Sequence, residues 1–565
     1  MTTRNYDASI VWKVRESLPP QIYRGEQNGA IYDFARGIVP FVNPPYPSPV
    51  VPPTPPPTPG SFIWVMQNLY VYGGGAPSIT TTIKCDTTGN FYRYEQGSSD
   101  LFIFGTENNR LVVGSSILIS PILQFLIIKF NSDGTFIWAA RNGMGSSTGV
   151  LNTFSNIFNN NLCISNIFRT NVSTFHSNSQ VASTFAGVNT VATGIFVAKY
   201  NTSGFNIWLL RLSGANITGN EVTFPTITNS DNDIIYVSGQ YRSTFSTFNA
   251  NNHLTVISTL STTTSGVTSD IFLARYSSIG TNDWLARIAG SNDDLNPFII
   301  ADTSDNVYIS GQYKLNISTF NAGSQFVPIS TLTGFSSALN DLFVAKYNSN
   351  GTNAWLVKIG GTSDRINPVV EYNKTDSVIY ITGVFRGNMS TFNADGSLAS
   401  TLHNAKGGAL HDIFIAKYLP DGTNKWLVKI GGTNNSAIPI LGSDNFGNIY
   451  ITGNFVTNIS TFNIDSEVIP ISTLVRDNTS GFVSDFFIAK YNNTGHNVWL
   501  TKIGTSNTSG SSSSQLSVTC DNLGHIYLAC PYFSDIRFYD AQVLTPAITL
   551  ERYSFGSMFV AKMLA

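Results

Sequence analysis

The sequence has few charged residues. Only 12% of its 565 residues are Asp, Glu, Lys or Arg, about half of the ~25% usual in soluble proteins, and the formal net charge is −2. A basic surface for nucleic acid or an acidic tail is therefore not expected. Disorder driven by charge is also excluded, because 42% of the residues are hydrophobic and 12% are aromatic. The many Ser, Thr, Asn and Gly residues favour turns and strand surfaces over helix interiors.

Cysteine is scarce, and long apolar segments are absent. The four cysteines are too scattered to predict a disulfide framework or a zinc site. We expect Cys85 and Cys520, each followed by an Asp, to be small buried apolar residues. The most apolar run, 117–128, is shorter than a membrane span and contains Pro121 and Gln124. The segment 1–18 lacks an apolar core, so it predicts no signal peptide.

Tryptophan reveals an internal repeat. Seven of the eight tryptophans recur at nearly equal intervals along the chain. A second series repeats with the same period, because seven strand-like segments open with a Phe and end in a Lys or Arg. The tryptophans are Trp64, Trp138, Trp208, Trp284, Trp355, Trp426 and Trp499. The cations are Lys129, Lys199, Arg275, Lys346, Lys417, Lys490 and Lys562.

One repeat predicts four strands, which we call A to D. Residues 366–373, 378–385, 412–419 and 424–432 are rich in β-branched and aromatic residues and are separated by turn residues or by a long B–C connection. No helical period extends beyond a few residues in 61–565. Seven such units predict an all-β, seven-bladed β-propeller of four-stranded antiparallel blades.

The chain ends predict how the ring closes. Residues 61–67 match strand D with no strands A to C before them, and residues 557–565 match strand C with no strand D after them. We therefore expect the N-terminal strand to pair with the C-terminal strand, so that no sheet edge is left at the junction.

The B–C connections have a pattern of their own. Ser-Thr-Phe recurs in five units, and a second Ser-Thr followed by Phe or Leu comes later at an even offset, as in 390–392 and 400–402. An even offset keeps facing side chains on one side if the two arms pair as a hairpin. We expect these connections to form a wide rim that is rich in Ser, Thr and Asn. The unit that begins near residue 81 lacks the motif and departs most from the pattern.

These motifs resemble those of the SBBP-type β-propeller repeat proteins. The matching segments are Asp412-Ile-Phe-Ile-Ala-Lys417, Gly422-Thr-Asn-Lys-Trp426 and Asp444-Asn-Phe-Gly-Asn-Ile-Tyr-Ile-Thr-Gly453, and the resemblance covers about 61–565. Such repeats occur in bacterial surface proteins and in proteins of large DNA viruses. The resemblance implies a scaffold rather than a reaction. The weakly charged, Asn/Ser/Thr-rich composition is similar to that of giant-virus virion proteins.

The segment 1–60 differs from the repeats. Residues 40–60 form a Pro-rich linker, since 40–59 hold 11 of the 24 prolines, and proline favours the extended polyproline II conformation. Residues 1–39 are predicted to bind a protein partner, such as a capsid, so that the propeller of 61–565 is tethered to a larger assembly. Two alternatives stay open: a disordered tail, or a proline-rich ligand for an aromatic groove.

Repeated polar residues favour structural roles. We expect the cation of strand C and the cation three residues after Trp to contact neighbouring blades, and the tryptophans to pack between blades. The Asp before strand C (Asp270, Asp341, Asp412 and Asp485) is expected to accept backbone N–H bonds. The D-x-x-G-N turns hold too few carboxylates for calcium. His411 is expected to be a solvated loop residue.

The sequence predicts no catalytic residue, metal ligand or cofactor, because no known catalytic or phosphate-binding motif occurs. It favours a non-enzymatic structural or interaction protein, which we expect at a virion surface, with host glycans or proteins bound at the B–C rim and no membrane span. One alternative is a propeller-fold lyase or glycoside hydrolase, for which Asp293, Asp294 and Glu371 are the candidate acids. Another is an interaction scaffold in the cytoplasm of the producing cell.

Overall fold

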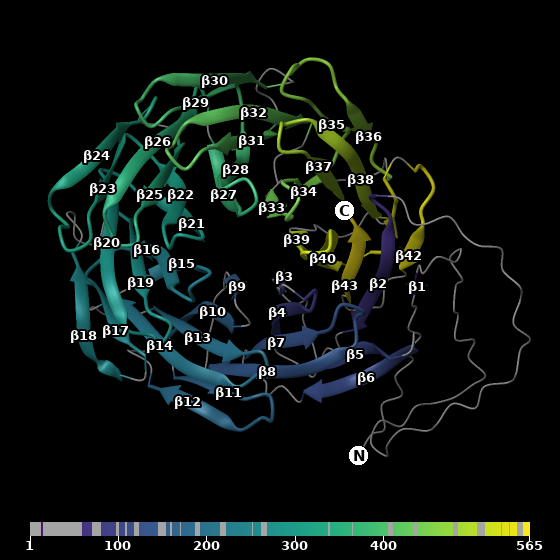
Figure 1. Ribbon diagram of the computed structural model, residues 1–565, viewed down its shortest axis with the longest axis horizontal. Coiled ribbons are helices and arrows are strands. Elements are labelled where there is room, and N and C mark those ends of the chain that lie inside the picture. Colours follow the sequence, from purple (N-terminus) through teal and green to yellow (C-terminus); the bar gives the residue numbers. More distant parts are fainter. Residues whose placement is uncertain are drawn as a thin grey trace, which may run out of the picture.

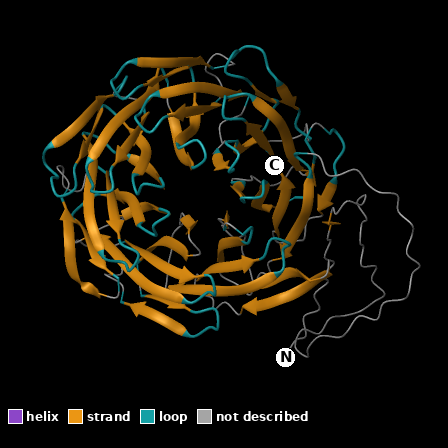
Figure 2. Ribbon diagram, viewed as in Figure 1, coloured by secondary structure: helices purple, strands orange, loops and turns teal. Residues whose placement is uncertain are grey.

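The protein is a closed ring of seven β-sheets around one axis (Figure 1). The computed structural model describes residues 13–14, 59–69 and, with gaps, 81–565. All regular elements in these residues are strands (Figure 2). The expected all-β, seven-bladed propeller is therefore confirmed. The segments 1–39 and 40–60 lie outside the described residues except for 13–14 and 59–60, so their roles stay predictions.

Each blade has strands A to D in order from the axis outwards, all antiparallel. Strand A is β3 (Thr81–Cys85), β9 (Phe154–Phe158), β15 (Val222–Asn229), β21 (Leu295–Ala301), β27 (Arg365–Asn373), β33 (Ile440–Ser443) and β39 (Ser517–Cys520) in blades 1 to 7. Strand B is β4 (Phe91–Gly97), β10 (Asn161–Phe168), β16 (Ile235–Tyr241), β22 (Val307–Tyr313), β28 (Val378–Phe385), β34 (Ile449–Phe455) and β40 (His525–Tyr532). Strand C is β7 (Gln124–Phe130), β13 (Gly194–Asn201), β19 (Asp270–Tyr276), β25 (Asp341–Tyr347), β31 (Asp412–Tyr418), β37 (Asp485–Tyr491) and β43 (Ser557–Leu564). Strand D is β8 (Phe136–Met144), β14 (Asn206–Gly214), β20 (Asn282–Gly290), β26 (Asn353–Gly361), β32 (Asn424–Gly431), β38 (Asn497–Thr505) and β2 (Phe62–Leu69).

The expected four strands per blade are corrected to six in blades 1 to 6. The B–C connection of each following unit folds into a hairpin, and its first arm pairs with strand D of the blade before it. The pairs are β11 (Val172–Phe175) and β12 (Val181–Phe185), β17 (Phe245–Asn249) and β18 (Asn252–Leu260), β23 (Asn316–Phe320) and β24 (Pro328–Thr333), β29 (Asn388–Phe392) and β30 (Leu398–His403), β35 (Ile459–Thr461) and β36 (Ser472–Leu474), and β41 (Ile536–Phe538) and β42 (Ile548–Leu550). The hairpin covers an edge that strand D would otherwise expose. Each of these blades is thus completed by the next unit.

The predicted ring closure is confirmed. Strand β2 pairs with β43, from Phe62 opposite Met563 to Leu69 opposite Ser557, and completes blade 7 beside β40. On its outer side β2 pairs with the short β1 (Lys13–Val14). The B–C connection of blade 1 forms a separate two-stranded sheet, β5 (Leu101–Glu107) and β6 (Arg110–Ile117). This confirms that the first unit departs most from the pattern.

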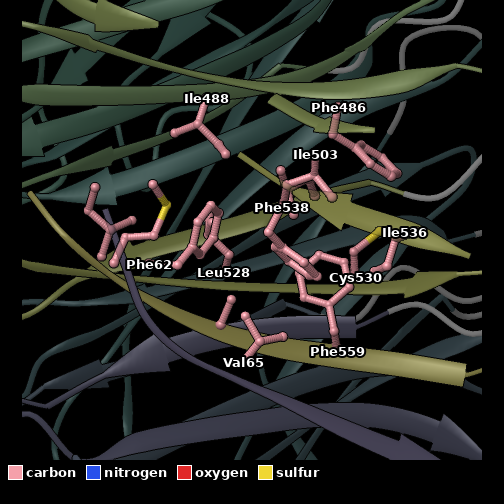
Figure 3. Packing of buried hydrophobic residues seen from close by; sticks show 14 of the residues in the cluster. Phe62, Val65, Phe486, Ile488, Ile503, Leu528, Cys530, Ile536, Phe538 and Phe559 are labelled. Atoms are coloured by element: carbon pink, nitrogen blue, oxygen red, sulfur yellow. The ribbon is translucent and has the colours of Figure 1, made fainter. Parts of the chain in front are cut away.

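The hydrophobic core is divided into seven clusters, one at each interface between neighbouring blades. At the 6/7 interface the ring of Phe538, from the last hairpin, packs edge-on against Phe62 of β2 and Phe559 of β43, with ring centroids 5.1 and 5.0 Å apart (Figure 3). Both faces of every blade are covered in a closed ring, so strands B and C are apolar on both sides. Burial at these interfaces is the main source of stability.

The recurring pairing of glycine and phenylalanine within a unit has a packing cause. Gly311 of β22 lies opposite Phe343 of β25, and a Cβ atom at Gly311 would approach that ring to 2.6 Å. The same pairing recurs at Gly239, Gly383 and Gly453. The Gly that ends the Y-x-[ST]-G segment is therefore required because the strand C aromatic ring lies across it.

Candidate functional site

Most of the repeated tryptophans and strand C cations join neighbouring blades, as expected, whereas Arg275 pairs with Asp283 of its own blade. In blade 4 the Trp355 Nε1–H donates to the carbonyl oxygen of Pro420 in the C–D turn of blade 5, at 2.9 Å. The Lys346 ammonium donates to the same oxygen at 3.2 Å and lies 5.3 Å from the ring centre of Tyr308. Trp138 with Lys129, Trp208 with Lys199 and Trp426 with Lys417 repeat this convergence on one carbonyl oxygen. These side chains are structural.

The second cation, three residues after Trp, holds the hairpin. Arg287 lies over the ring of Phe320 at 5.3 Å and Lys429 over Phe462 at 5.1 Å. Each Phe belongs to a Ser-Thr-Phe arm that comes from the next unit but pairs into the same blade, so the expected contact between blades is corrected to a contact between units within one blade.

An Asn two residues before Trp is a repeated structural residue that the sequence patterns above do not single out. The Thr391 hydroxyl of hairpin arm β29 donates to Asn424 Oδ1 at 3.1 Å, and the Asn424 N–H donates to Asn393 Oδ1 at 2.8 Å. The Asn424 amide nitrogen also donates to the carbonyls of Lys417 and Trp426 across a β-bulge. The equivalent residues are Asn206, Asn282, Asn353 and Asn497. The period of this Asn in the sequence is the signal that could have found it.

The Asp before strand C accepts backbone N–H bonds, as expected. Asp412 accepts from Gly432 at 3.0 Å, and Asp485 accepts from Thr505 at 2.9 Å and Asp477 at 2.7 Å. Asp341 likewise accepts from Phe335. Asp270 differs, because it pairs with the guanidinium of Arg287 at 2.8 Å.

The D-x-x-G-N turns use their carboxylates internally. Asp444 accepts hydrogen bonds from the N–H groups of Phe446 and Asn448, the Asn448 amide and the Tyr450 hydroxyl. Asp302 is surrounded in the same way. The described residues contain no group of three His, Cys, Asp or Glu side chains placed to hold a metal ion. The hydrogen bonds account for this Asp without calcium.

The expectation for His411 is wrong, and Cys85 and Cys520, which are expected to be buried, are only half-buried. His411 is buried, because it immediately precedes Asp412 where strand C enters the blade. Cys163 and Cys530 are buried, whereas Cys85 and Cys520 are half-buried on the innermost strands. Burial raises the pKa of all four thiols, so they behave as weak acids with little thiolate.

The 3/4 interface holds a buried carboxyl group that does not recur at the equivalent position of the next interface. Asp294, just before β21, is fully buried, and neither of its carboxylate oxygens forms a well-aligned hydrogen bond with a described residue. Among the described residues, the buried hydroxyls of Tyr241 and Tyr313 lack such a bond as well. Burial, and then the nearby carboxylate of Asp270, raise the pKa of Asp294 well above its ordinary value. Burial also raises the pKa of Asp270 to about 6, although Arg287 opposes the shift.

The 4/5 interface has the opposite charge at the equivalent position. Arg365, which precedes Ile366-Asn-Pro as Asp294 precedes Leu295-Asn-Pro, is fully buried. Its guanidinium lies 3.5 Å from the Asp341 carboxylate and donates to the Asn388 carbonyl at 2.6 Å. The 3/4 interface therefore carries one buried carboxyl group in excess, and the 4/5 interface does not.

The candidate acids of the enzyme hypothesis are not brought together as an open pair. Asp293 accepts the Ser269 N–H at 2.8 Å, whereas Asp294 is enclosed. Glu371, on the innermost strand of blade 5, accepts the Ser443 hydroxyl of blade 6 at 3.0 Å. Burial raises the pKa of Glu371, and the Lys84 ammonium of blade 1 offsets part of the shift. All three carboxyl groups contact neighbouring blades or turns rather than forming one reaction centre.

The hairpins form an outer belt with exposed hydroxyl pairs. Ser318 and Thr331 face each other across β23 and β24 with their oxygens 2.8 Å apart, and the pair is exposed. The same pair recurs at Ser173–Thr184, Ser390–Thr401 and Ser460–Thr473. Neighbouring hairpins are also linked, for example by His403 and Glu467, whose Nδ1 and Oε1 atoms are 2.7 Å apart. The predicted rim is thus an ordered belt of hairpins.

Comparison with known proteins points to a viral relative. The chain is 24% identical over 496 residues to "Uncharacterized WD repeat-containing protein L264" of Acanthamoeba polyphaga mimivirus, covering 74% of this chain and 34% of the relative. The chain thus spans about a third of the relative's length. No family model matches the sequence, so SBBP membership stays a prediction. The relative supports a viral β-propeller repeat protein.

Similar solved structures include the phage phi92 endosialidase, with a TM-score of 0.33 and 10% identity over 86% of this chain and 67% of that chain. Another is the rhamnogalacturonan lyase YesW, with a TM-score of 0.26 and 10% identity over 75% of this chain and 91% of that chain. The described part of the chain holds no helix with the length and hydropathy of a membrane span.

Proposed function

We propose that this protein is a non-enzymatic interaction protein whose hairpin belt binds a host glycan or protein. The exposed Ser–Thr pairs of the hairpins carry the proposal. Each hydroxyl both donates and accepts, and the pairs recur from blade to blade around the ring, which suits several hydroxyl-rich contacts at once. The mimivirus relative, named as a WD repeat-containing protein, supports an interaction role.

We further propose that residues 1–39 bind a protein of a larger assembly, with 40–60 as spacer, and that this assembly is a virion surface. Mass spectrometry of purified particles tests the location. A chain lacking residues 1–58 keeps Gly60, which accepts from Ala541 and donates to Leu564 in the closing turn. This variant should fold but be lost from particles; its retention would contradict the tether.

Binding is tested with the full chain on a glycan array and by affinity capture with host surface proteins. The double variant Ser318→Ala, Ser390→Ala removes two exposed hydroxyl pairs and should reduce binding severalfold. Ser304→Ala, in an A–B turn, is the matched control. Equal binding by all three proteins would contradict a role for the belt.

The proposal that the chain is not an enzyme has its own test. A lyase or glycoside hydrolase would need an acid with access to substrate, whereas Asp294 is enclosed and Glu371 is bound to Ser443. We expect no cleavage of acidic or neutral polysaccharides by the full chain. Cleavage that is abolished by Asp294→Asn or Glu371→Gln would overturn the proposal.

A further inference from the structure

Strand β18 is the longest of the outer edge strands. It extends over nine residues, Asn252–Leu260, and is the outermost strand of its sheet; within the part of the chain that the structure describes it pairs only with β17. One edge of an outermost strand presents N–H and C=O groups that no other strand of its sheet covers, and such an edge can pair with another strand.

The other edge strands are shorter, and several are flanked by proline. β24 begins at Pro328, and Pro470 and Pro546 lie two residues before β36 and β42, which have three residues each. Proline lacks the N–H that strand pairing needs and protects sheet edges. β12 has five residues and β30 has six. The N–H of Ser261, just after β18, donates to Gln325 as that of His403 donates to Glu467, so this contact does not distinguish β18 from β30. β18 has neither proline nor short length.

The side chains of β18 favour pairing rather than solvation. Leu254 is 92% exposed, Val256 49% and Ile257 41%. No charged residue occurs from Ser243 to Ser269, so nothing in the segment repels an identical strand. A charged partner strand would gain no ion pair here, whereas a second β18 brings matching aliphatic and hydroxyl side chains.

We infer that β18 pairs antiparallel with β18 of a second copy of this chain, joining two rings edge to edge around a two-fold axis. An isologous pairing of this kind places the same residues on both sides of the interface. It would extend the six-stranded sheet of blade 2 into one continuous sheet shared by both copies. The contact is small, so we expect a reversible dimer rather than a permanent one.

The oligomeric state of the full chain tests the inference. Light scattering coupled to gel filtration, from about 1 to about 100 µM, should show the mass rising from monomer to dimer. Ile257→Lys places like charges close together across the axis and should weaken the dimer at least tenfold. Leu254→Lys should also weaken the dimer. Because the Leu254 side chain is 92% exposed, this substitution should not disturb folding, so a loss of dimer would report on the interface itself.

The matched control is Ile329→Lys on β24, whose side chain is 47% exposed beside Pro328. It should dimerise like the unchanged protein, and all variants should keep the same melting temperature. A protein that stays monomeric at every concentration would overturn the inference. A dimer that persists in both Ile257→Lys and Leu254→Lys would also overturn it. The same holds for a dimer that dissociates only in Ile329→Lys.

Discussion

The interface between blades 4 and 5 and the interface between blades 6 and 7 contain the same backbone hydrogen bond between strands C and D. At the first interface these strands are joined by a continuous turn, and at the second they come from the two ends of the propeller. At the first, a continuous C–D turn, Leu419 to Thr423, presents the Pro420 carbonyl to Trp355 and places Gly422 over the indole ring. At the second, Leu564 and Gly60 come from opposite ends of the propeller. The Gly60 N–H still donates to the Leu564 carbonyl at 2.8 Å, as the Gly422 N–H donates to Leu419 at 3.0 Å.

The two interfaces differ in their polar contacts. Trp499, the counterpart of Trp355, has no hydrogen-bond partner for its Nε1–H among the described residues. The position held by Asn424 in blade 5 is held in blade 7 by Phe62, which is fully buried. The closing interface therefore replaces a hydrogen-bonded amide with apolar packing. Backbone geometry can be reproduced without a covalent turn, whereas the side-chain partners of the turn are not all reproduced.

The largest effect is expected from breaking the closing interface. Phe62→Ala should lower the free energy of unfolding by about 3–5 kcal/mol, because a fully buried ring that contacts Phe538 is removed. Urea denaturation gives the free energy, and limited proteolysis should show earlier cleavage near β2. A loss below about 1 kcal/mol would mean that β2 contributes little to closure.

A second effect compares the 4/5 interface with the 3/4 interface. The folded protein holds a proton on Asp294 to a higher pH than the unfolded chain does. The stability that this group contributes is therefore greatest below the ordinary carboxyl pKa and falls as the pH rises through the raised pKa of the folded state. Asp294→Asn should raise the free energy of unfolding at pH 8 by about 1–3 kcal/mol and change it little near pH 4.

Urea denaturation of both proteins across this pH range measures the difference. Asp341→Asn, which removes the partner of Arg365, is the control and should destabilise the protein near neutral pH. A pH-independent effect of Asp294→Asn would show that its proton is not held by the folded state.

A third effect concerns the turn glycines. Gly422 has φ of +83°, and a Cβ atom there would lie 2.7 Å from the Cβ of Ala394 and 3.1 Å from the Trp355 ring. Gly422→Ala should cost about 1–2 kcal/mol. Gly60→Ala, at φ of +81° and with its Cβ atom in closer contact with the Cβ of Ala541, should cost at least as much. Melting temperatures compare the two; a clearly smaller loss for Gly60→Ala would mean that the closing junction adjusts more easily than the continuous turn.

The smallest effect is the difference between two tryptophans. Trp355→Phe and Trp499→Phe remove similar apolar area, but only the first also removes a hydrogen bond to a described residue and leaves the Pro420 carbonyl with one donor fewer. Trp355→Phe should therefore be more destabilising by about 1 kcal/mol in urea denaturation. The reverse order would indicate a further partner for Trp499.

Much of the fold can be predicted because its signals are local and repeated. The tryptophan period and the turn glycines indicate seven units, and the unmatched strands at 61–67 and 557–565 indicate the closure. The hairpin is also visible, as an even offset between Ser-Thr pairs. The sheet to which the hairpin is added cannot be predicted from the sequence. The strand that pairs with the hairpin belongs to the preceding unit, and this pairing depends on how the blades pack in space.

The charges are harder to predict. The strand C cations and the Asp before strand C can be assigned from sequence because most of them recur in the same surroundings, with Arg275 and Asp270 as exceptions. Asp294 and Arg365 occupy equivalent positions, but the side chains they meet come from the preceding blade. His411 is wrongly predicted because its place beside a loop suggests exposure, whereas it lies buried where strand C enters the blade.

The amino-acid order alone determined the number of blades, their direction and the junction that closes them, since these follow from short-range patterns of apolar, aromatic and turn residues. Only the tertiary structure decided which sheet each hairpin completes, which carboxyl groups are buried, and which edge strand has an unpaired edge long enough to bind another strand. Those features depend on contacts between successive units that are distant in the sequence, and such a contact exists only once the ring has brought the two units together.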